Sequence, residues 1–229
     1  GEYVAYVFAG GESTAATARS VSFDDGGGGG DYLSLSNDTE MSPGTGDFCI
    51  EAWVNPDSWS NLDGVVGHDS GGFELSASAT KLIFKQTTGS TILEADQPEI
   101  GQWTHVAVTR SGTSLKMFFN GTQVDTATDS TNFTGTNNGF YIGAYAGVFD
   151  GKISNLRFVK GSAVYTTSFK TPTEPLTNIT NTVLLCCNNS STTGSTVTPG
   201  TITANGSPAA STDSPFDDPA GFVFGDAGD

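Results

Sequence analysis

The chain has 229 residues and a formal net charge of −16, from 9 Lys and Arg against 25 Asp and Glu, so its charge opposes binding to nucleic-acid phosphates or to an anionic membrane surface. Its apolar runs are all shorter than the roughly 20 residues that a membrane-spanning helix needs, so we do not expect membrane insertion. The hydrophobic fraction of 36% is enough to build one sandwich core.

Short segments in which apolar and polar residues alternate recur along the chain and predict β-strands, because successive side chains of a strand point to opposite faces. Helical periodicity is almost absent. The predicted strands are residues 3–8, 20–23, 32–35, 47–55, 64–68, 72–76, 81–85, 92–95, 103–110, 114–120, 122–126, 139–144, 151–159 and 183–187. This series predicts an all-β fold, a two-sheet antiparallel β-sandwich with extended N- and C-terminal flanks.

One hairpin is especially clear. Leu115, Met117 and Phe119 fall on the same face of a strand, which we expect to lie in the core. Asn120-Gly121 follows, and this pair accepts positive φ at both central positions of a tight turn. The pattern therefore predicts that the next strand folds straight back.

The two ends of the chain differ from the middle. Residues 188–215 are mostly Ser, Thr, Asn, Gly, Pro and Ala, and predict a polar strap that wraps the sandwich or leaves it. Residues 3–9 and 216–225 are apolar, and we hypothesise that they belong to a neighbouring domain. The predicted division is an N-terminal flanking strand (1–17), the sandwich (18–187), and a polar strap with a C-terminal flank (188–229).

The three cysteines do not form a disulfide framework. Cys186 and Cys187 are adjacent, so in a strand their side chains would point to opposite faces. There is no C-x-x-C spacing for zinc. We expect small buried hydrophobic side chains.

Five segments in fixed order resemble the laminin-G-like branch of the concanavalin A-like jelly roll. They are VSFDDGGGGGDYLSL, GDFCIEAWVNP, GQWTHVAVTRSGTSLKMFFNG, YIGA and FDGKISNLRFVKGSAVY, between residues 21 and 165. The resemblance implies two packed antiparallel sheets in a protein that binds carbohydrate or other proteins outside the cell. The flanks AYVFAGG and LLCCNNSSTTGSTVTPGTITANG are similar to those of such modules in virion proteins of marine bacteriophages.

A sugar site on this fold would use aromatic faces beside polar groups in loops at strand ends. The candidate glycan-binding residues are Trp59, His68, Tyr145 and Phe149. Trp53 and Trp103 are alternatives, although both are also typical of core residues. Calcium is the metal to consider, since turn aspartates supply the oxygen ligands it prefers and the resemblance implies one Ca²⁺ at a sandwich edge. The candidate Ca²⁺ ligands are Asp24, Asp31, Asp63, Asp69 and Asp150.

The hypothesis that the chain is an enzyme depends on the segment EADQPE, residues 94–99, which matches the E-x-D-x-x-E pattern of glucanases on this fold. A retaining glycosidase needs two carboxyl groups about 5 Å apart, one of them with a raised pKa. Pro98 lies inside the pattern and cannot donate to a central ladder. We therefore expect a solvated acidic turn and no catalysis.

The function predicted from the sequence is noncatalytic. The main prediction is a virion-surface structural or adhesion module, a decoration or appendage protein that contacts other subunits, forms a homo-oligomer and binds host-surface glycans. The alternative is a bacterial secreted or cell-surface carbohydrate-binding adhesion domain. A glucanase is a distant alternative. The expected location is the virion surface or outside the cell, with no nucleic-acid partner.

Overall fold

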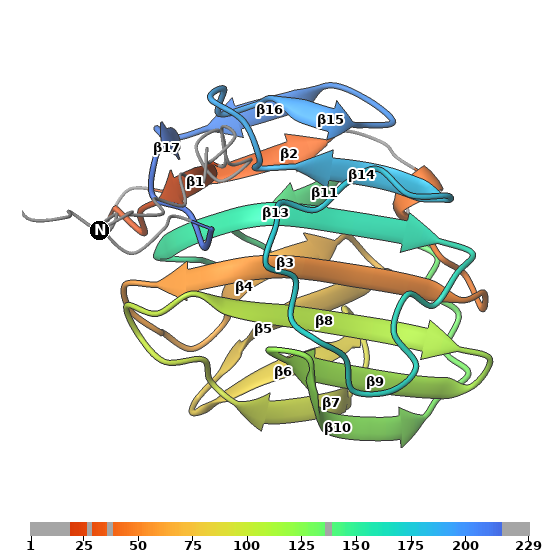
Figure 1. Ribbon diagram of the computed structural model, residues 1–229. Coiled ribbons are helices and arrows are strands. Elements are labelled where there is room, and N and C mark those ends of the chain that lie inside the picture. The colour runs from red at the N-terminus through yellow and green to blue at the C-terminus, as the bar shows by residue number, and fades with distance from the viewer. Residues whose placement is uncertain (1–18, 27–28, 36–38, 136–138, 217–229) are drawn as a thin grey trace, which may run out of the picture.

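Two antiparallel sheets pack face to face in the computed structural model, which describes residues 19–26, 29–35, 39–135 and 139–216 (Figure 1). The first sheet contains, in spatial order, β10 (Thr122–Thr128), β9 (Ser114–Phe119), β8 (Thr104–Ser111), β3 (Phe48–Pro56), β13 (Gly151–Lys160), β1 (Ser20–Phe23) and β17 (Ala209–Ser211), with β14 (Thr182–Cys186) and then β15 (Ser195–Val197) branching from β13. The all-β sandwich predicted from the sequence is confirmed.

The second sheet lies behind the first in Figure 1. It contains β16 (Ile202–Asn205), β2 (Tyr32–Leu35), β11 (Phe140–Ile142), β4 (Asp63–His68), β5 (Phe73–Ser78), β6 (Lys81–Gln86) and β7 (Thr91–Asp96), with the short β12 (Gly147–Val148) parallel to β4. A single turn of 3₁₀ helix, Thr39–Met41, precedes β3. Among the described residues there is no helix long and apolar enough to cross a membrane.

The predicted strands within the described residues are present, with bounds shifted by a few residues; the predicted strand 3–8 lies outside the described residues. The polar stretch after residue 188 adds three strands that its composition did not predict. β16 pairs with β2 of the second sheet, and β17 pairs with β1 of the first. This stretch therefore hydrogen-bonds to both sheets, although it contributes little apolar area.

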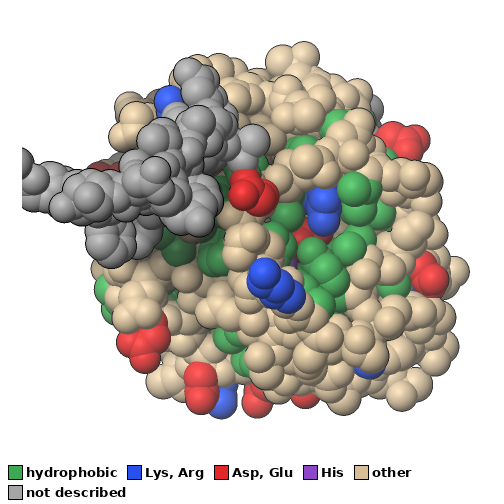
Figure 2. Space-filling model, in the orientation of Figure 1, with side chains coloured by type: hydrophobic (Ala, Val, Ile, Leu, Met, Phe, Trp, Pro, Cys, Tyr) green, Lys and Arg blue, Asp and Glu red, His purple; other side chains and the backbone are tan. Residues whose placement is uncertain are grey.

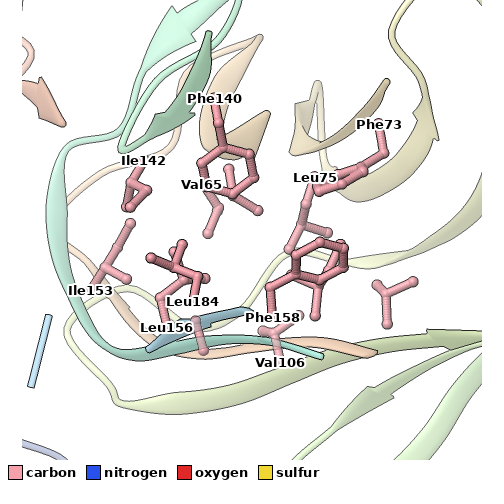
Figure 3. Packing of buried hydrophobic residues seen from close by; sticks show 14 of the residues in the cluster. Val65, Phe73, Leu75, Val106, Phe140, Ile142, Ile153, Leu156, Phe158 and Leu184 are labelled. Carbon is pink, nitrogen blue, oxygen red and sulfur yellow. The ribbon is translucent and has the colours of Figure 1, made fainter. Parts of the chain in front are cut away.

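Apolar side chains from both sheets meet in one core. Figure 3 shows Phe73, Phe140 and their neighbours from the second sheet facing Ile153, Phe158 and their neighbours from the first. The rings of Phe73 and Phe84 stack with centroids 5.9 Å apart. Burying a phenylalanine side chain of this size stabilises the fold by about 1.5–3 kcal/mol.

A buried cation closes one end of this core. The guanidinium of Arg110 donates to the carbonyl oxygens of Gly44, Gly46 and Thr131 and lies 5.1 Å from the ring centres of both Phe48 and Phe133. These bonds hold two loops against the sheet. Successive residues of β8 point to opposite faces of the sheet, and Arg110 falls on the face that points into the core.

The adjacent cysteines differ from the sequence prediction. Cys187 lies just beyond β14 with φ of 57°, so the strand alternation has already ended. Both thiols are buried in the same core, with their Sγ atoms 3.8 Å apart. The expected opposite orientation is wrong, whereas the prediction of free, buried cysteines is confirmed.

A long segment, residues 161–181, crosses the outer face of the first sheet, and we call it the crossover loop (Figure 1). Beneath it lies a buried ionic network centred on Glu51. Arg157 donates twice to Glu51 Oε1, at 2.9 and 2.6 Å, while His105 Nε2 lies 3.1 Å from Oε2. Tyr165 of the crossover loop donates its hydroxyl to Oε2 at 2.8 Å. The network therefore ties the loop to the sheet.

Glu51 is ionised in this network. Burial alone would raise its pKa, but the hydrogen bond with His105 and the charge of Arg157 outweigh burial and hold the pKa below its ordinary value. A group whose pKa is lower in the folded state stabilises the fold above its unfolded-state pKa, which for glutamate is about 4.3. That stability is lost as the pH falls toward the folded-state pKa.

We predict that Glu51→Gln lowers the free energy of unfolding near neutral pH by about 3–5 kcal/mol, because it leaves the buried Arg157 without its counter-charge. The same variant should lose less additional stability on acidification than the parent protein. Urea unfolding across the acid range measures both effects. Glu99→Gln, at an exposed position, is the matched control and should leave both unchanged. An equally steep acid limb in Glu51→Gln would contradict the assignment.

Candidate functional site

Three tyrosines gather on the outer face of the second sheet. In β2 Leu33 is buried, so Tyr32 points outward; in β11 Phe140 and Ile142 are buried, so Tyr141 points outward. The rings of Tyr32 and Tyr141 meet edge to face, with centroids 6.0 Å apart. Tyr141 and Tyr145 follow at 6.3 Å. Adjacent strands and one loop thus build an aromatic row.

Tyr145 packs closely against the sheet because the strand beneath it has no side chain at Gly67. A Cβ on Gly67 would lie 2.6 Å from both Cβ and Cγ of Tyr145. The loop that carries Tyr145 is tightened by a hydrogen bond from its own N–H to Gly147 O, at 3.1 Å. The ring is therefore held against the sheet from below.

The phenols of Tyr141 and Tyr145 remain protonated at neutral pH. Burial raises the pKa of Tyr145, and the nearby charges of Asp69 and Glu74 raise it further. Burial and the charge of Asp69 also raise the pKa of Tyr141. Each hydroxyl can therefore donate as well as accept a hydrogen bond.

A pocket of about 290 Å³ opens between these rings, lined by Gly29, Tyr32, Tyr141, Ala144, Tyr145, Ala146, Gly147 and Val148. We call it the tyrosine pocket. A second hollow of about 470 Å³ shares Gly29 and Tyr32 with it and adds Asp31, Asn205 and Ser207. Together the two hollows place aromatic faces beside amide, hydroxyl and carboxylate groups, a combination that suits a polyhydroxylated ligand with apolar ring faces.

The four predicted glycan residues do not form one site. Tyr145 lines the tyrosine pocket. Trp59 is half-buried, donates its indole N–H to Pro98 O at 2.9 Å and packs edge to face against Phe149. Phe149 is 0% exposed and belongs to the core. These two aromatics follow strand ends, as predicted, but their rings turn inward to cover apolar surface.

His68, also predicted to bind a glycan, lies in the core as well. It is 2% exposed and lies among the core rings of Phe73 and Phe140. Its register partner on β11 is the inward-facing Phe140, so His68 also faces inward. Trp53, on the outer face of the first sheet, is buried against Phe216. Neither side chain presents a surface to a ligand.

Sequence reasoning missed Tyr32 and Tyr141. The signal was present, because both alternate with core residues in YLSL and FYI. What the sequence does not contain is the pairing of Tyr141 with Ser34, which brings β2 beside β11. Without that neighbour, each tyrosine is a single outward aromatic side chain.

The candidate Ca²⁺ ligands are spread over several turns, where they accept hydrogen bonds. The bonds run to Asp24 from Gly26, to Asp31 from Ser207, to Asp63 from Ser60, to Asp69 from Ser70 and to Asp150 from Ser58. The pKa of Asp63 is raised by burial and by the charges of Asp25 and Asp150. Within the described parts of the chain no group of three or more metal-binding side chains could hold an ion. Calcium binding stays a prediction.

The carboxylates of the EADQPE segment lie at the rim between the sheets. Glu94 and Asp96 are exposed on β7, at the end of the strand order; Glu94 lies in a strand as predicted, whereas Asp96 extends that strand and does not belong to the expected turn. Asp96 pairs with Lys81 at 2.7 Å, which lowers the pKa of Asp96. A general acid of a glycosidase needs a raised pKa, so this pairing disfavours that role for Asp96.

The family model described as the concanavalin A-like lectin/glucanases superfamily matches residues 26–164. The chain belongs to this superfamily. The match begins in the loop before β2 and ends in the crossover loop, so it includes all three tyrosines of the pocket. A search of the curated proteins finds no match to this sequence.

Solved structures share the fold. A protein of Bacteroides ovatus ATCC 8483, proposed to bind carbohydrate, superposes with a TM-score of 0.62 at 16% identity, over 85% of this chain and 60% of its own. The heptameric SAP-like pentraxin of Limulus polyphemus gives 0.57 at 13% identity, over 86% of this chain and 95% of its own. The chain spans less than two thirds of the Bacteroides protein. At these identities the likeness shows the fold alone.

We predict that Gly67→Ala displaces Tyr145, because the new Cβ would have to occupy the space of its ring. The expected result is a loss of about 1–3 kcal/mol in stability, together with changed NMR shifts for residues 143–148. Gly89→Ala is the control, since the atom nearest to a Cβ added at Gly89 is the Cβ of Gln86, at 3.3 Å. Unchanged shifts for Tyr145 in Gly67→Ala would show that the ring is not held by this approach.

Proposed function

We propose that the protein is a noncatalytic carbohydrate-binding domain that uses the tyrosine pocket and acts outside the cell. The observation that carries the proposal is the packed row of Tyr32, Tyr141 and Tyr145 on the outer face of a lectin-type sandwich. Aromatic faces of this kind stack on the apolar faces of sugar rings, while polar groups at the rim select hydroxyl positions.

The family and the Bacteroides structure support this function better than a virion-surface role. The superfamily model names lectins and glucanases, and the Bacteroides protein is proposed to bind carbohydrate. None of the comparisons points to a bacteriophage or a virion. The virion role, the subunit partners and the homo-oligomer therefore stay predictions from the sequence.

The charge around the pocket favours a neutral glycan. Asp31 lines the adjoining hollow, Asp69 and Glu74 act on the phenols, and no Lys or Arg lines either hollow. The carboxylate of Glu74 is buried and already paired with Lys85 at 3.4 Å. An acidic sugar would instead meet the unpaired charges of Asp31 and Asp69, with no Lys or Arg among the described lining residues, so local repulsion adds to the net charge of −16.

The first test is a glycan array followed by calorimetry on the best ligand. Tyr141→Ala and Tyr145→Ala should each weaken binding by about tenfold or more, since a lost aromatic face removes roughly 1.4 kcal/mol. Tyr141→Phe keeps the ring and should bind within about threefold of the parent. Trp59→Phe alters an aromatic outside the pocket and should bind normally. Full affinity in both alanine variants would refute the site.

The second test compares neutral with acidic ligands. At the tyrosine pocket, followed through the NMR shifts of residues 141–148, we expect binding of neutral oligosaccharides and none of their sialylated or uronic-acid counterparts. Because no ion pair forms, the affinity for a neutral ligand should change by less than about twofold when salt is raised well beyond physiological strength. A preference of this pocket for the acidic member of a matched pair would overturn the proposed ligand class. The location of the site would still be decided by the tyrosine variants of the first test.

A further inference from the structure

A second, smaller pocket lies on the opposite sheet, at the edge of the crossover loop. It measures about 230 Å³ and is lined by Thr109, Ser111, Ser114, Lys116, Tyr165 and Thr166. We call it the hairpin pocket, because β8 and β9 supply its floor. It shares no lining residue with the tyrosine pocket. Whatever it binds is therefore independent of the proposed sugar site.

Strand alternation turns hydroxyl and ammonium groups into this pocket. Val108 and Arg110 of β8 face the core, so Thr109 between them faces outward. Leu115 and Met117 of β9 also face the core, so Lys116 faces outward as well. Thr109 and Lys116 are directly paired across the two strands. The crossover loop then covers them, and this cover converts an outward-facing polar patch into a pocket.

Thr109 has a buried hydroxyl without a partner. Its side chain belongs to a residue that is 1% exposed, and within the described residues no group is hydrogen-bonded to its Oγ1. A buried hydroxyl left unsatisfied costs about 1–3 kcal/mol. Valine has the same shape and would avoid that cost. Because Oγ1 is itself inaccessible to solvent, the hydroxyl meets a ligand in the pocket wall that Thr109 lines only after a change of the Thr109 rotamer.

Lys116 supplies the charge. Its ammonium donates one hydrogen bond to Thr166 O, at 2.6 Å, which holds it against the pocket wall. An ammonium has three donors, so two remain. Among the residues that the structure describes, no carboxylate lines the pocket. Asp47, beside the hairpin turn, accepts a hydrogen bond from the N–H of Gly112 at 2.7 Å.

Figure 2 views the face of the first sheet, where the acidic side chains lie mainly toward the rim. Charges more than about 8 Å apart are largely screened at physiological salt. The ammonium of Lys116, which lines the pocket, therefore acts on a ligand there more strongly than the acidic side chains at the rim do.

We propose that the hairpin pocket binds a small oxyanion group, a phosphate, sulfate or carboxylate. The ammonium of Lys116 and the hydroxyls of Thr109, Ser111 and Ser114 donate to its oxygens, which are the contacts that such anions make in proteins. A cation would find no carboxylate there, and an apolar group would leave the hydroxyls unpaired. The volume exceeds the ~30 Å³ of a single water several-fold, so an oxyanion has room.

The test is an NMR titration of the whole chain with inorganic phosphate, at constant ionic strength set with sodium chloride. We expect saturable shifts of the amides of residues 109–116. Lys116→Gln should abolish them, and Thr109→Val should weaken binding by about tenfold. Lys170→Gln, which removes the same charge at an exposed residue outside the pocket, should titrate as the parent does. Shifts that never saturate, or that survive in Lys116→Gln, would overturn the proposal.

Stability gives a second readout that does not depend on the titration. Without phosphate, Thr109→Val should be at least as stable as the parent, because it removes an unsatisfied hydroxyl. Phosphate should then stabilise the parent but not this variant. A Thr109→Val variant that is clearly less stable without phosphate would show that ordered water already satisfies the hydroxyl, and that the pocket holds water only.

A comparison of a sulfated sugar with inorganic sulfate separates the two sources of the anion. An O-sulfated monosaccharide that binds more tightly than inorganic sulfate would identify a group carried on a glycan, whereas equal affinity would identify the free ion. Tyr141→Ala should leave both affinities unchanged, so failure of the sugar site and failure of the hairpin pocket are distinguishable.

Discussion

The requirement that each sheet bury one face against the other governs every functional feature of this molecule. With a period of two along each strand, the residues that pack into the core also decide which residues cannot. Phe140 and Ile142 face inward and so expose Tyr141; Val108 and Arg110 do the same for Thr109. Both candidate pockets are thus consequences of core packing.

Loops convert these outward-facing rows into sites. On the second sheet, the loop carrying Tyr145 lies against Gly67, where the missing side chain allows close approach. On the first sheet, the crossover loop is held by the hydroxyl of Tyr165, which donates to Glu51, and by Thr177, whose carbonyl accepts from Arg157. In both places a loop is fixed by a few specific contacts, so the space that remains beside it has a defined shape.

The buried ions play different parts. Glu51 balances Arg157 and positions the crossover loop, while Arg110 donates to backbone oxygens, lies 3.9 Å from the carboxylate of Asp129 and closes the end of the core between two phenylalanine rings. Buried charges of this kind require complete partners, because each would otherwise lose its solvation without compensation. They restrict how the loops can be arranged, and so they preserve the geometry of both faces.

The sequence by itself determined the class of fold and most strand positions, because alternation is a local property that a single strand displays. It also marked Tyr145 as a loop aromatic. It did not identify Tyr32 and Tyr141 as partners, place Phe149 and His68 in the core, or find strands in the polar stretch after residue 188. Those outcomes depend on which strands become neighbours and on which side a loop covers. Contacts between distant segments decide both, and only the assembled sandwich contains them.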